Sequence, residues 1–185
     1  MQKKVMFTAF AGALMMSATF AGAADLPESL TLDGKTYPRT VTDKTTQKEC
    51  GACHMAFAPA RLTGNGWKKL MSGLEDHFGE NASLPAETTK HIEDYMVANS
   101  FDAKGGFRAK LTIDTWKKKG VVDPIRLTKV PGWERDHSSD LYKQMVKDFK
   151  YDRGSDCMKC HKNAEYGLYE SFGESGAPLP KPDGK

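Results

Sequence analysis

This chain of 185 residues is short of cysteine, of net charge and of apolar side chains. Its formal charge is +3, and it falls to +1 when Lys3 and Lys4 are set aside. Nucleic acid is therefore an unexpected partner, because binding its phosphates calls for a strongly basic surface. Only 39% of the residues are hydrophobic, so the chain has little material for a core of its own.

Long apolar runs are also missing after residue 23, which leaves no segment that could cross a bilayer. The one apolar run, residues 5–20, follows two lysines and precedes the small residues Ala21-Gly22-Ala23. This order is typical of a secretory signal with cleavage before Ala24. We expect residues 1–23 to be a signal peptide and the mature protein to lie in the periplasm, without stable insertion in the membrane.

The only four cysteines lie in two copies of one pattern, Cys50-Gly51-Ala52-Cys53-His54 and Cys157-Met158-Lys159-Cys160-His161. Cys-x-x-Cys-His is the attachment signature of c-type haem, in which both thiols form thioethers and the histidine lies under the iron. A zinc site or disulfides are the alternatives. Two copies that use every cysteine, behind an export signal, favour two covalently bound haem c groups. Buried haems would also supply the missing apolar interior.

With His54 and His161 as proximal ligands, three histidines remain for the opposite sides of the two irons: His77, His91 and His137. Methionine is the rival ligand and raises the reduction potential, whereas a second histidine gives a low one. The candidates are Met55, Met71, Met96, Met145 and Met158, but methionine at helical spacing usually fills the core. Helices are predicted over 67–78 and 83–99, and each carries a histidine beside its apolar face. Position alone therefore does not separate His77 from His91.

Changes in composition along the chain indicate where its segments begin and end. We expect an extended arm over 24–46, a first haem domain over 47–105, a second over 106–170 and a disordered tail over 171–185. Residues 110–116 fit a short strand or a helical turn equally well. Basic residues gather before and within Lys117-Lys118-Lys119. This cluster could dock an acidic partner, but a solvated surface is the favoured interpretation.

The sequence resembles the bacterial dihaem cytochromes c of the DHC type. The resemblance rests on the first motif with Met55-Ala56-Phe57, on residues 76–84 (DHFGENASL), on Arg126-Leu127-Thr128 and Arg135-Asp136-His137, and on the second motif. It implies bis-histidine ligation of both irons. His77 would complete the first site and His137 the second. His91 falls outside the pattern and is interpreted as a surface or packing residue.

Together the helical pattern and the resemblance indicate a mainly α, small, two-lobed c-type cytochrome with long irregular segments. Its haems would form much of the core. The implied function is electron transfer through two low-potential haems to redox partner proteins. The resemblance suggests a small oxygen-binding monohaem cytochrome, and sometimes a membrane cytochrome b. Two alternatives stay open: a small dihaem enzyme with one open catalytic haem, and a non-haem metal-binding module.

Overall fold

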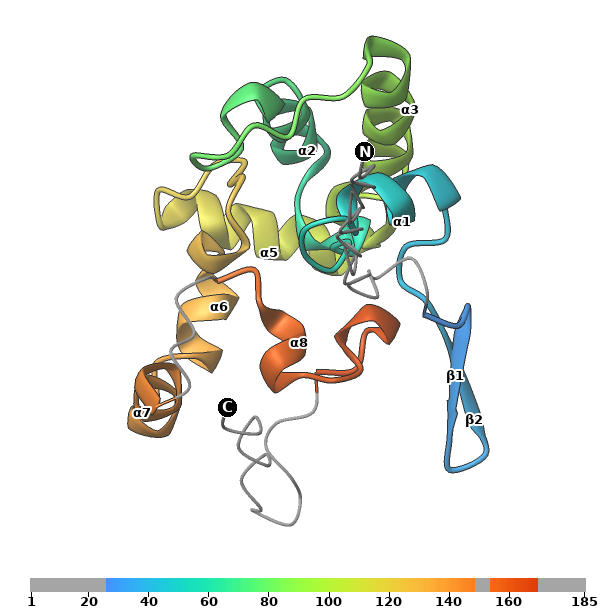
Figure 1. Ribbon diagram of the computed structural model, residues 1–185. Coiled ribbons are helices and arrows are strands. Elements are labelled where there is room, and N and C mark those ends of the chain that lie inside the picture. Colours follow the sequence, from blue (N-terminus) through green and yellow to red (C-terminus); the bar gives the residue numbers. More distant parts are fainter. Residues whose placement is uncertain (1–25, 149–153, 170–185) are drawn as a thin grey trace, which may run out of the picture.

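The structure, a computed structural model, describes residues 26–148 and 154–169 (Figure 1). The predicted signal peptide, 1–23, and the predicted tail, 171–185, lie outside this described part. The predicted borders between the arm and the two haem domains stay predictions. Within the described residues, no helix is both long enough and apolar enough to cross a membrane.

Most of the ordered structure is helical, which confirms the predicted fold class. The α-helices are α1 (Lys44–Cys50), α2 (Gly64–Met71), α3 (Ala86–Ala98), α4 (Phe101–Lys104), α5 (Gly106–Lys118), α6 (Pro131–Asp136), α7 (Asp140–Asp148) and α8 (Cys157–Cys160). Short 3-10 turns lie between or after them: η2 (Pro59–Arg61), η3 (Leu74–Asp76), η4 (Leu127–Lys129) and η5 (Ala164–Tyr166). Long irregular stretches connect these elements, as expected for a chain with few core residues.

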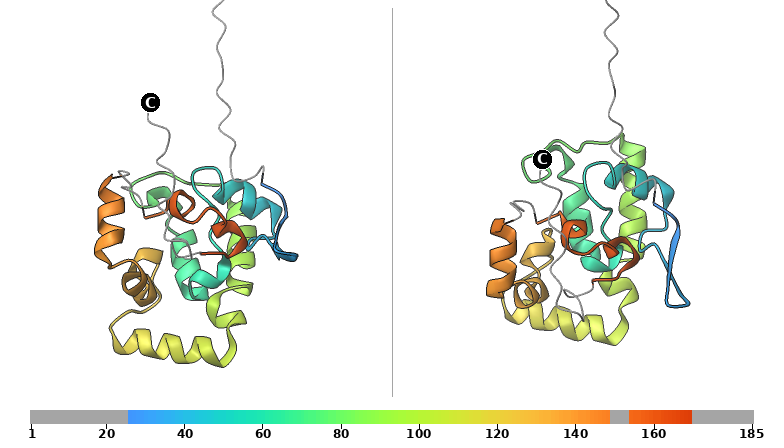
Figure 2. Two further views of the ribbon diagram at one scale, coloured as in Figure 1. Left: turned by 90° about the horizontal axis from the view of Figure 1, so that it is seen from below. Right: turned by 60° about the horizontal axis from the view of Figure 1, so that its bottom comes forward.

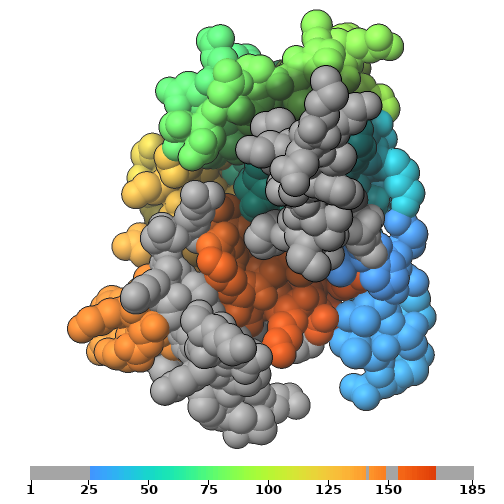
Figure 3. Space-filling view, in the orientation of Figure 1, coloured from blue at the N-terminus to red at the C-terminus, as the bar shows by residue number. Residues whose placement is uncertain are grey.

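The N-terminal arm folds back as a hairpin of β1 (Ser29–Leu32) and β2 (Lys35–Pro38), paired antiparallel. Its turn residues Asp33 and Gly34 have φ of 49° and 74°, the positive values that a type I′ hairpin turn requires. Behind the hairpin the arm is tied to the far end of the described chain. Arg39 Nη2 lies 2.6 Å from Glu165 Oε2, and both side chains are only 2% exposed. Figure 3 shows the hairpin beside the segment 154–169, which fills the middle of that face.

Helices α2 and α3 pack together and enclose the first hydrophobic cluster. Its buried members are Leu62, Trp67, Met71, Ile92 and Met96. The indole N–H of Trp67 donates to the Pro59 carbonyl at 2.7 Å, so this buried donor is satisfied. The second predicted helix is present as α3, and its start follows Pro85.

The first predicted helix, 67–78, is wrong at its C-terminal end. Helix α2 begins at Gly64, where the hydroxyl of Thr63 accepts the N–H of Gly66, and it ends at Met71. The N–H of Gly73 then bonds to the Leu70 carbonyl, a tighter spacing than the α-helix uses. Apolar spacing continues to residue 78, but the backbone has left the helix by then. The last part of the predicted helix is instead η3 and a turn.

Residues 110–116 lie within helix α5, so the helical alternative is the one that the structure adopts. The indole of Trp116 is buried and stacks on Phe101 of α4 with centroids 5.6 Å apart. Both views of Figure 2 show α5 along the outer edge of the molecule, beyond α2 and α3. After α5 the chain returns to the first cluster, where Leu127 and Val130 pack.

Candidate functional site

His54 and His77 lie close together in the first half of the chain. Their ring centroids are 6.2 Å apart and the ring planes differ by 21°. The Nδ1 atom of His54 lies 2.7 Å from the Met55 carbonyl. A proton on Nδ1 donates to this carbonyl, which leaves the Nε2 lone pair available to a metal.

His77 is presented by a tight turn that directly follows η3. Its N–H donates to the Glu80 carbonyl at 2.7 Å, and the two residues between them have positive φ, 60° at Phe78 and 101° at Gly79. The carboxylate of Asp76 accepts the N–H of Gly79 at 2.9 Å. A phenylalanine in the left-handed region costs about 1–2 kcal/mol, and such strain is often found at functional sites.

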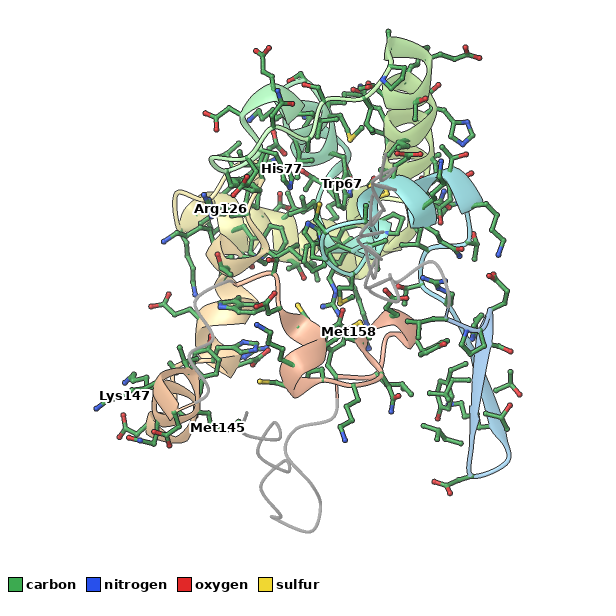
Figure 4. The ribbon with its side chains drawn as sticks, in the orientation of Figure 1. Trp67, His77, Arg126, Met145, Lys147 and Met158 are labelled. Carbon is green, nitrogen blue, oxygen red and sulfur yellow. The ribbon has the colours of Figure 1, made fainter. Side chains whose placement is uncertain are left out.

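Burial lowers the pKa of His77, and the charges of His54 and Arg126 lower it further. Both effects favour the neutral imidazole, the form that binds a metal. Arg126 comes from the second half of the chain, and its guanidinium lies 4.0 Å from the ring centroid of Phe78. Figure 4 shows Arg126, His77 and Trp67 in the same part of the molecule, and Met158 below them on α8.

The second pair is His161, which follows α8, and His137, which follows α6. Their centroids are also 6.2 Å apart, but the planes are nearly perpendicular at 87°. Nδ1 of His137 lies 3.0 Å from the Trp133 carbonyl, and the Trp133 ring stacks on the imidazole at 3.8 Å. The His137 ring is thus fixed on one side by the indole and on another by the edge of Tyr142 at 5.0 Å.

The spacing of both pairs is the one that two imidazole ligands of a single metal ion would have. Metal–imidazole bonds of about 2 Å place the centroids of two rings on opposite sides of one metal ion about 6.3 Å apart. The observed 6.2 Å in each pair matches this spacing. The Nδ1 contacts of His54 and His137 with carbonyls match the usual surroundings of a metal-bound histidine. That these four residues ligate iron stays a prediction.

The two cysteine motifs lie beside their histidine pairs on different local structures. Cys50 ends α1, whose first turn is capped by Asp43, and Cys53 lies in the following turn. Cys157 and Cys160 are the first and last residues of α8. Burial raises the pKa of the Cys50 thiol to about 11 and also raises the pKa of Cys157 and Cys160.

The two histidine sites share one wall, which is formed by Phe57 and Met55. Phe57, three residues after His54, packs on the first hydrophobic cluster and also on the second, whose buried members are Met55, Cys157 and Ala164. Its ring centroid lies 4.9 Å from that of His54. Met55 is itself buried against the second motif. The residues that follow the first motif therefore form part of the second site, which places the two sites next to each other.

Phe57→Ala should destabilise the holoprotein by about 2–3 kcal/mol, because a half-buried aromatic side chain is lost between two clusters. It should also shift the reduction potentials of both haems, since it opens each site to water. Phe107→Ala is the matched control, because Phe107 is exposed on α5. Urea denaturation and a redox titration measure the two effects. A shift at one haem only would contradict the shared wall.

The other candidate ligands lie in different surroundings. Nε2 of His91 lies 2.9 Å from Asp43 Oδ2 on the exposed side of α3, at the cap of α1. Met71 and Met96 are buried in the first cluster, and Met145 is on α7. Within residues 26–148 and 154–169, no three His, Cys, Asp or Glu side chains gather as a non-haem metal site would need.

Two features of the site region have no signal in the sequence. At each pair an arginine from the other half of the chain lies over an aromatic ring: Arg126 over Phe78 beside His77, and Arg61 over Tyr169 beside His161. The contact of the arm with Glu165, four residues after His161, is the second feature. For the turn that carries His77 the sequence does contain a local signal, because Gly79 readily adopts the positive φ found there.

Two comparisons with known proteins gave matches for this chain. A family model described as dihaem cytochrome c (DHC) matches residues 46–169. The chain is similar to the structure of a dihaem cytochrome c from Rhodobacter sphaeroides, with 38% identity, a TM-score of 0.58, and coverage of 70% of this chain and 98% of that one. It is also similar to a dihaem cytochrome c from Shewanella baltica OS155, with 29% identity, a TM-score of 0.51, and coverage of 68% and 85%. No curated protein gave a significant match.

Proposed function

Because this chain belongs to the dihaem cytochrome c family, with covalent haem attachment at Cys50, Cys53, Cys157 and Cys160, we propose that it carries electrons through two bis-histidine sites. His54 and His77 hold the first iron in this proposal, and His161 and His137 hold the second. Family membership implies electron transfer. The ligands, the low potentials and the partners are our proposal.

The observation that carries the proposal is the equal spacing of the two histidine pairs. Each pair is 6.2 Å apart, so each would occupy both axial positions of its iron. A haem whose axial positions are both taken has no place for a substrate, which favours outer-sphere electron transfer over the alternative of a dihaem enzyme. When bound, each haem supplies an iron that changes between the ferric and ferrous states.

The side chains of this protein have three tasks in such a carrier. His54 and His137 keep their ring orientation through carbonyl contacts at Nδ1, so little rearrangement accompanies a change of charge. Phe57 and Met55 exclude water from the space between the sites. Arg126 and Arg61 place positive charge near the two pairs, which favours the reduced state and offsets part of the low potential of double histidine ligation.

For partners and location, the proposal follows the family resemblance. In this proposal the electron acceptor is a small oxygen-binding monohaem cytochrome, and a membrane cytochrome b is a second partner. The predicted signal segment places the exchange in the periplasm. Two adjacent sites in one small chain suit this task, because an electron can enter at one haem and leave at the other.

A spectroelectrochemical titration of the exported holoprotein, combined with ferric electron paramagnetic resonance, tests the proposal. We expect two low-spin haems of low potential and two distinct ferric signals, because the ring planes of the two pairs differ by 21° and 87°. A sulfur-to-iron absorption band in the ferric protein would indicate methionine ligation instead. Stoichiometric carbon monoxide binding by the unmodified ferrous protein would favour the enzyme alternative.

A further inference from the structure

The outer face of α5 carries two exposed apolar side chains in successive turns. Phe107 is 74% exposed and Leu111 is 51% exposed, and their i, i+4 spacing places them on one side of the helix. The opposite side of α5 is used inside the protein, where Ala109 and Trp116 are buried. Phe107 and Leu111 therefore point away from the core, and neither has a role in the two histidine sites.

Basic residues surround this apolar pair. The segment 104–119 holds six of them, Lys104, Arg108, Lys110, Lys117, Lys118 and Lys119, and one acidic residue, Asp114. Its formal charge is +5, whereas residues 24–185 together carry only +1, so the remainder of that chain carries −4. On a helical projection Arg108 falls on one flank of the apolar pair and Lys110 on the other. Positive charge is thus concentrated on α5 and on the residues that flank it.

Helix α5 is also placed where a flat surface can reach its whole length. In both views of Figure 2 it runs along the outer edge of the molecule, with the remaining elements on its inner side. Its 13 residues make a helix about 20 Å long. A helix exposed in this way can lie parallel to a planar surface.

We propose that α5 docks this protein on an anionic lipid surface, with Phe107 and Leu111 inserted at the level of the headgroups. Aromatic and leucine side chains between lysines are typical of helices that lie in a membrane interface. The abundance of lysine on and beside α5 favours a membrane over an acidic protein as the partner, because lysine is depleted in protein–protein interfaces. At a bilayer, by contrast, its long aliphatic stem rests on apolar groups while the ammonium meets lipid phosphates. The inference goes beyond electron transfer and does not depend on which residues ligate the irons.

The test is sedimentation of the holoprotein with vesicles of phosphatidylglycerol and phosphatidylethanolamine, with the bound fraction read from haem absorbance. We expect binding to these vesicles, weaker binding at high salt, and none to vesicles of phosphatidylcholine alone. Two double variants change the surface without touching the core: Phe107→Ser with Leu111→Ser, and Lys117→Glu with Lys118→Glu. Each should weaken binding by about tenfold or more.

The matched control is Lys143→Glu with Lys147→Glu, which makes the same charge change on α7. It should keep most of the binding, and all variants should keep the haem spectrum of the unmodified protein. Absence of binding to anionic vesicles would overturn the proposal and leave an acidic protein as the occupant of α5. Equal losses in the α5 and α7 lysine variants, or no loss in the Phe107–Leu111 variant, would also overturn it.

Discussion

Replacing His77 with alanine should open the first haem, so that the ferrous variant binds about one carbon monoxide per protein and the unmodified protein binds none. The reason is the position of His77, whose ring centroid lies at the axial spacing from that of His54. Removal of its imidazole leaves one iron position to water or gas, and the first haem becomes high-spin. Carbon monoxide titration with visible spectroscopy measures the stoichiometry and the spin change.

His91→Ala is the control that separates the two histidines that sequence position alone does not distinguish. The imidazole of His91 lies on the exposed side of α3, beside the Asp43 carboxylate. Its loss should leave both haems low-spin. His137→Ala should open the second haem in the same way as His77→Ala opens the first. A high-spin first haem in His91→Ala, with a low-spin one in His77→Ala, would contradict our assignment.

Arg39→Ala should destabilise the protein by about 3–5 kcal/mol, because it leaves the carboxylate of Glu165 buried without its counter-charge. The removal of Lys90 from its exposed pair with Asp94 is the control and should change stability by less than about 1 kcal/mol. Adding Glu165→Gln to Arg39→Ala should recover much of the loss, since the buried charge is then absent. Urea denaturation followed by circular dichroism measures each free energy of unfolding.

The Arg39→Ala variant should also lose stability as the pH rises. Burial raises the pKa of Glu165 even though Arg39 opposes this shift, and removal of Arg39 raises the pKa further. Between the ordinary pKa of glutamate and this raised value, the folded state binds more protons than the unfolded state. The free energy of unfolding therefore falls with increasing pH in that window. A variant that is equally stable at pH 5 and pH 8 would contradict the buried, unpaired carboxylate.

Sequence patterns predicted the features that depend on neighbouring residues. The two Cys-x-x-Cys-His motifs and helix α3 follow from residues close together in the sequence. The end of α2 did not, because the apolar spacing continues to residue 78 while Gly73 and the 3-10 bonds have already ended the helix. For residues 110–116 the alternation was ambiguous, and the packing of Trp116 on Phe101 favours the helix.

The features that the sequence did not predict depend on long-range contacts. The pairing of Arg39 with Glu165 joins residues 126 positions apart, and the arginines over Phe78 and Tyr169 each come from the other half of the chain. No periodicity or motif encodes such pairs. The choice of His77 and His137 over His91 came from the family resemblance. Geometry adds the 6.2 Å spacing, a quantity that no sequence pattern supplies.

The contact between Arg39 in the arm and Glu165 also closes the chain between these two residues into a loop. Both cysteine motifs lie between Arg39 and Glu165 along the chain, so the pair encloses them within one loop. Chain ends are normally where fraying starts, and each end frays independently of the other. Here the backbone of Thr40 and the side chain of Arg39 both bind Glu165, near the end of the described residues. Local unfolding at either end of this loop must break the same contacts. Unfolding at one end is therefore coupled to unfolding at the other.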